Sequence, residues 1–171
     1  MAVGNLEFIK SASGTSVSSL DVTDCFSADY DVYKIVIDNF QPTVLGNSSS
    51  RFIDSVGSVI SSAEYDYAAL NMKSNTTFGE SRATNQTFIS PYQQSASSYS
   101  SGNNIVMYVF NPYDSSSYSF CQWQSNSYDA GALIGRKGIG VHKSAEQITG
   151  INFLNSNGGN ITIDVSVYGV K

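Results

Sequence analysis

The chain has 171 residues, 41% of them hydrophobic and only 13% charged, with a net charge of −5 and an isoelectric point near 4.6. This length fits one domain with a sizeable core, and no stretch approaches the roughly 20 apolar residues of a membrane span. The acidic balance, without any cluster of Lys or Arg, excludes the charge pattern of a protein that binds nucleic-acid backbones.

The first half of the chain is predicted to be a series of strands. In residues 30–37, both sets of alternate positions contain apolar side chains, so both faces of the strand are apolar. This pattern predicts a central strand that is covered on both sides. A short strand is expected at 51–53, closed by a turn at 54–57. Residues 62–70 could form helical turns or a strand, and we favour the strand.

The middle of the chain is less regular. Residues 71–103 are rich in Asn, Ser, Thr and Gln, so we expect an exposed insertion or a pair of long loops, with one strand at 86–89. Strands return at 105–110 and 118–123, and the alternation in the second places Phe120 and Trp123 on opposite faces of the strand. The glycine-rich segment 135–140 lacks the spacing of a phosphate-binding loop and is interpreted as a flexible turn.

The last stretch, 148–171, has the most regular pattern. Ile161, Ile163, Val165 and Val167 share one face, and we expect these residues to belong to a terminal hairpin whose turn spans 155–160. The whole pattern predicts an all-β fold: a single-domain β-sandwich over residues 1–171, jelly-roll-like, with about eight to ten antiparallel strands.

Cysteine usage and the start of the sequence bear on the redox environment. The first residues lack the basic and apolar regions of a signal peptide, so we expect a protein made and kept without export. Cys25 and Cys121 are therefore predicted to be buried, reduced thiols rather than a disulfide.

No residue pattern predicts a catalytic centre, a cofactor or a metal. His142 is the only histidine and is interpreted as a satisfied or exposed side chain rather than a catalytic one. The pairs Asp21 with Asp24 and Asp29 with Asp31 lack the dense spacing of a calcium loop and are interpreted as solvated loop carboxylates. We therefore expect a protein that is not an enzyme.

Aromatic side chains are the one positive indication of function. Tyr92, Tyr99, Tyr113 and Tyr128 lie in polar, loop-like stretches, where rigid rings suit a protein interface or a platform that stacks on sugars. Trp123 joins them as a candidate contact residue. The alternative is that several of these rings cover the core from its rim. The low charge favours packing against another surface, including copies of the same chain.

Several segments, taken in order, resemble a family of small structural proteins of tailed bacteriophages. The resemblance runs from Glu7 to Lys171 and is carried by the following segments: 30–35, 51–55, 64–68, 109–112, 151–153 and 167–171. It implies a single β-sandwich domain carried on the virion, assembled in the host cytoplasm, with no catalytic residue and no cofactor.

The resemblance leaves the position on the particle open. The first expectation is a capsid decoration or head-fibre protein, a homotrimer that packs on the major capsid protein, because the chain is one domain without a long shaft. The second is an accessory domain of a tail fibre or baseplate that binds host-surface glycan through Trp123 or the loop tyrosines. A glycan-cleaving enzyme ranks last, because no pair of carboxylates has a distinctive setting.

Overall fold

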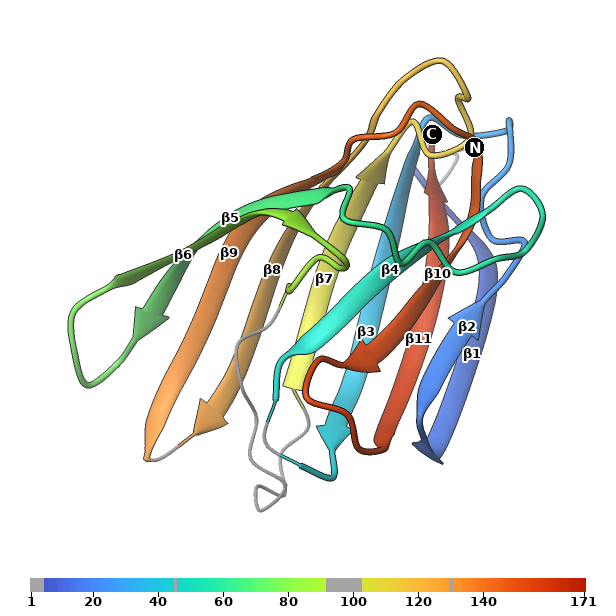
Figure 1. The fold of residues 1–171 in the computed structure, drawn as a ribbon. Coiled ribbons are helices and arrows are strands. Elements are labelled where there is room, and N and C mark those ends of the chain that lie inside the picture. The colour runs from blue at the N-terminus through green and yellow to red at the C-terminus, as the bar shows by residue number, and fades with distance from the viewer. Residues whose placement is uncertain (1–4, 45, 92–102, 130) are drawn as a thin grey trace.

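The computed structural model describes residues 5–44, 46–91, 103–129 and 131–171, and the regular elements within them are all β-strands (Figure 1). The strands are β1 (Leu6–Val17), β2 (Ser19–Val22), β3 (Val32–Pro42), β4 (Ser48–Asp54), β5 (Tyr65–Lys73), β6 (Gly79–Gln86), β7 (Asn103–Phe110), β8 (Ser119–Asp129), β9 (Ala132–His142), β10 (Ile148–Asn155) and β11 (Ile161–Val170). They form an eight-stranded sheet, β1-β11-β3-β7-β8-β9-β5-β6, and a three-stranded sheet, β2-β10-β4.

The two sheets are the layers of a β-sandwich of unequal halves. In Figure 1, β4 and β10 pass across β3 and β11 of the larger sheet, while β5, β6 and β9 extend to the left beyond them. Phe52 of β4 and Phe153 of β10 belong to the same buried cluster as Ile35 of β3 and Val165 of β11. The predicted all-β sandwich is confirmed, with eleven strands rather than eight to ten among the described residues.

Alternation along each strand builds the core. Ile161, Ile163, Val165 and Val167 are all buried on the inner side of β11, as the sequence pattern predicts. The strand expected at 51–53 forms as part of β4, and the strand favoured for 62–70 forms from residue 65 onward, as β5. The sequence predicts that both faces of β3 are covered. One face is not, because the side chains at positions 32 and 36 are only partly buried.

The terminal segment is not a hairpin, which corrects the sequence-based prediction. β10 pairs with β2 and β4 in the small sheet, whereas β11 pairs with β1 and β3 in the large one. The turn at 155–160 therefore carries the chain from one layer to the other, with Gly158 and Gly159 at φ angles of 76° and 80°. Alternation alone could not distinguish a hairpin within one sheet from a connection between two sheets. In both arrangements each strand buries one face against the core.

The glycine-rich segment is also not a flexible turn. It forms most of β9, which pairs with β8 on one side and β5 on the other. A Cβ atom at Gly138 would lie 2.4 Å from Cζ2 of Trp123, and one at Gly140 would lie 3.0 Å from Sγ of Cys121. These glycines leave room for the buried Trp123 ring, so their role is steric rather than conformational.

The polar middle of the chain contains more structure than its composition indicates. The segment 79–86 forms β6, an edge strand that pairs with β5, although it contains no large apolar residue to reveal it. In place of the strand predicted at 86–89, Ile89 makes an isolated bridge with Ser50. Residues 92–102, within the predicted loop region, lie outside the described residues.

Both cysteines are buried and free, as predicted, and burial raises the pKa of each thiol to about 12. Because the thiolate is the reactive form, native protein should resist iodoacetamide at about pH 8. We expect no added mass in the native state and two added groups after denaturation, measured by intact-protein mass spectrometry. Rapid modification of either cysteine in the folded protein would contradict the packing described here.

The close approach of Gly138 to Trp123 makes a second prediction. Gly138→Ala should lower the free energy of unfolding by about 1 to 3 kcal/mol, the usual cost of overpacking, because the new Cβ would also lie 2.8 Å from the Ala68 carbonyl oxygen. Gly79→Ala is the matched control, since nothing lies within 4 Å of its added Cβ. Denaturant unfolding of both variants measures the difference, and equal stabilities would contradict the steric role.

Candidate functional site

The large sheet presents to solvent the side chains that alternate with its buried ones. β8 and β9 are paired so that Phe120 lies opposite Val141 and Gln122 opposite Ile139. β5 continues this surface on the far side of β9, where Leu70 lies opposite Lys137. We call this surface the outer face; its main side chains are Leu70, Tyr108, Phe120, Gln122, Gln124, Asn126, Tyr128, Leu133, Lys137 and Ile139.

The outer face carries five of the exposed large hydrophobic side chains. Their exposed fractions are 42% for Leu70, 52% for Phe120, 48% for Tyr128, 56% for Leu133 and 63% for Ile139. Single exposed apolar residues are ordinary, but several on adjacent strands of one sheet are characteristic of a surface that binds something.

The outer face is hollowed rather than flat. A groove of about 970 Å³ runs over β7, β8, β9, β5 and β6, and a second hollow of about 690 Å³ adjoins it, with Gln122 and Ile139 lining both. The larger hollow is also lined by four amide side chains: Asn104, Gln122, Gln124 and Asn126. Only Glu80, Arg82 and Lys137 among its lining residues are charged, a composition close to the centre of a protein interface.

The residues predicted as contacts are distributed unevenly. Tyr128 lies on the outer face and is half exposed, whereas Tyr113 is partly buried in the loop between β7 and β8; neither ring lines a hollow. Trp123 is only 3% exposed, and its ring packs against Gly138 on the inner side of the sheet. Trp123 therefore exposes little of its ring, although it is among the residues that line the groove. Tyr92 and Tyr99 lie outside the described residues.

Sequence reasoning missed the aliphatic members of this surface. Ile139 lies between two glycines in the segment interpreted as a turn, and Leu133 stands close before it. The alternation Leu133, Gly135, Lys137, Ile139 was the available signal, because every second position from 132 to 142 points inward.

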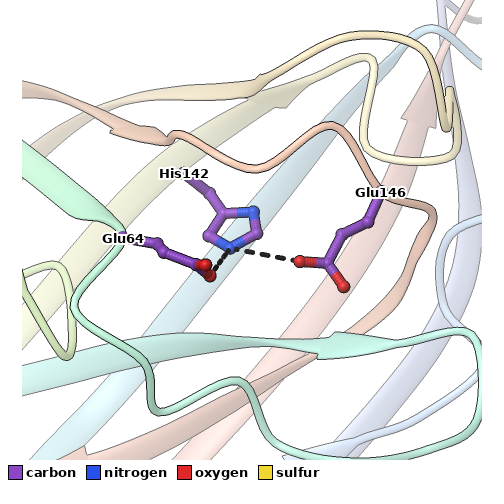
Figure 2. A group of neighbouring side chains, drawn as sticks. All are labelled: Glu64, His142 and Glu146. Carbon is purple, nitrogen blue, oxygen red and sulfur yellow. Dashed lines mark hydrogen bonds and ion pairs between the residues drawn. The ribbon is translucent and has the colours of Figure 1, made fainter.

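A second cluster lies at the end of β9, where His142 is fully buried between two carboxylates (Figure 2). Its Nε2 atom is 3.3 Å from Oε2 of Glu64 and 3.6 Å from Oε1 of Glu146. The Ser62 hydroxyl donates to Glu64, and this bond, together with His142, holds the pKa of the Glu64 carboxyl below its usual value. The arrangement differs from a Ser–His–acid relay, in which the serine bonds to the histidine.

Sequence analysis singled out neither glutamate, because Glu64 is 78 residues away from His142 in the chain. The pairing of Tyr65 with His142 between β5 and β9 brings them together. The cluster can hold a proton or a cation between its three side chains.

No protein-family model matches the chain, and no curated protein is detectably similar to it in sequence. In the part of the chain that the structure describes, no helix has the length and apolar character needed to cross a membrane. Function is therefore inferred from the side chains of the outer face.

Proposed function

We propose that this chain is a non-enzymatic structural protein of a tailed-bacteriophage virion, a capsid decoration or head-fibre protein that packs on the shell through its outer face. The observation that carries the proposal is the group of exposed apolar side chains on adjacent strands, in which Phe120 and Ile139 line the same hollow. The ordered sequence segments that resemble small virion proteins support the assignment to a phage particle.

The chemistry of the outer face favours a protein partner. Leu70, Leu133 and Ile139 are aliphatic, and they gain free energy by removal from water, at about 25 cal/mol for each Å² of apolar area buried. Aliphatic side chains offer little to a hydroxyl-rich sugar, but they match an apolar ridge on a protein. The partner in this proposal is the major capsid protein, and the copies that bind it form a homotrimer.

A specific observation favours a second candidate, an accessory domain of a tail fibre or baseplate that binds host-surface glycan. Gln122, Gln124 and Asn126 alternate along β8 and line the groove, and Tyr128 follows on the same face. Amides that donate and accept hydrogen bonds beside an aromatic ring are suited to sugar hydroxyls.

The outer face predicts how shell binding responds to mutation. Ile139→Lys should weaken binding to purified shells that lack this protein by at least about tenfold, or 1.4 kcal/mol, because it puts a charge into the buried contact. Val56→Lys is the matched control: Val56 is 82% exposed, but it lies in the turn after β4 and lines neither hollow. Sedimentation of shells with added protein measures the binding.

Two results would contradict the shell proposal. One is equal binding by wild type and Ile139→Lys, with both proteins shown to melt alike. The other is no shell binding together with binding to a glycan array that Tyr128→Ala abolishes, which would establish the second candidate instead.

Copy number makes a separate prediction about position on the particle. A decoration protein should be present at about one copy for each shell subunit, or one trimer for each local threefold axis. Quantitative mass spectrometry of purified particles gives this ratio against the major shell protein. A ratio far below these values would place the protein on the tail or at a vertex.

A further inference from the structure

We propose that Glu64, His142 and Glu146 form a binding site for a divalent transition-metal ion, with Zn²⁺ as the preferred occupant. In Figure 2 both carboxylates point toward the same ring nitrogen of His142. The three ligand atoms, one from each side chain, all lie within 4.8 Å of one another. The inference is independent of the function proposed for the outer face.

The backbone holds the three ligands in place. His142 is the last residue of β9, and Glu64 immediately precedes β5, which pairs with β9. The Lys143 N–H donates to the Glu64 carbonyl at 2.8 Å, which extends this pairing beyond the two strands. Glu146 is supplied by the loop that leads to β10, four residues after the histidine. Sheet register therefore places two of the three ligands, Glu64 and His142, and the short loop after β9 places the third.

The two distances from the histidine match those between ligands of a shared ion. Ligands about 2.1 Å from a common tetrahedral ion lie roughly 3.4 Å from one another. The Nε2 atom of His142 is 3.3 Å from one carboxylate oxygen and 3.6 Å from the other. A single N–H can point at only one of these oxygens, whereas a cation between the three atoms would contact all of them.

The local charge also favours a cation. Among the described residues, the ion pairs of Glu64 and Glu146 are with His142 alone, because the nearby Lys143 pairs with Asp66 at 2.9 Å. Two carboxylates beside one imidazole leave a negative charge that a divalent ion would neutralise. The carboxylate side chains are 39% and 34% exposed, so an ion can enter from solvent and keep water as further ligands.

The donor set selects the kind of ion. One imidazole nitrogen with two carboxylate oxygens suits Zn²⁺ and its first-row neighbours, whereas Ca²⁺ and Mg²⁺ prefer oxygen ligands only. The ring of His142 is oriented by packing, with its centre 4.9 Å from that of Tyr65 and 6.0 Å from that of Phe52. Its Nδ1 atom has no hydrogen-bond partner among the described residues, and sites without this outer support bind about 10 to 100 times more weakly. We therefore expect micromolar affinity.

The test uses the untagged full chain, treated with chelator and then titrated with ZnCl₂ by calorimetry. We expect one Zn²⁺ per chain, a Kd in the micromolar range, a rise in Tm, and little response to Mg²⁺. Glu146→Gln should weaken Zn²⁺ binding more than about tenfold and remain folded, because the ion pair with His142 is the one ion pair of its carboxylate among the described residues. Glu80→Gln is the control, since that carboxylate is 79% exposed on β6.

Co²⁺ substitution provides an independent reading of the ligands. Oxygen and nitrogen ligands should give weak visible bands without the intense near-ultraviolet band of a cobalt–thiolate bond, which separates this site from Cys25 and Cys121. Three outcomes would overturn the proposal: no binding of Zn²⁺ below about 100 μM, wild-type affinity in Glu146→Gln, or a thiolate band from the bound ion.

Discussion

The structure depends on how the three-stranded sheet covers the apolar inner side of the eight-stranded sheet. Three strands cannot cover eight, so the small sheet shields only part of the larger one. On the inner side of β8 and β9, large side chains fill the interior instead, with Trp123 over the β9 glycines and Arg136 beside the Tyr67 ring. The segment 87–91 also crosses this region, where Pro91 accepts a hydrogen bond from Ser125. The opposite side of the same strands is left to solvent, and this is the outer face.

The sequence predicted those parts of the fold that depend on local alternation. The alternation of apolar residues correctly predicts the inward faces of β11 and β3. It also predicts that Phe120 and Trp123 lie on opposite faces of β8. The errors arose where a nonlocal contact decides the structure. The sheet to which β10 belongs, and the reason for glycine at 138, depend on residues elsewhere in the chain. The edge strand β6 was missed because a polar strand paired on one side has no hydrophobic period.

The candidate sites were less predictable than the core. Tyr128 was recognised from its polar surroundings, but the outer face is a product of strand order, since β5 reaches β9 across almost 70 residues of sequence (70↔137). The same pairing brings Glu64 to His142, so one interstrand contact creates both the far side of the groove and the carboxylate–histidine cluster. Neither juxtaposition has a signature in the chain itself, because each depends on strand order.

One of the two edges of the large sheet, the β6 edge, has a consequence for strand addition. Among the described strands, β6 ends the sheet and has one row of backbone N–H and C=O groups without a neighbouring strand, yet its side chains are polar and include the exposed charges of Glu80 and Arg82. Charged edge strands discourage a second molecule from adding its own strand and so extending the sheet without limit. At the β6 border, growth by strand addition is therefore disfavoured, whereas the outer face can be contacted only through its side chains.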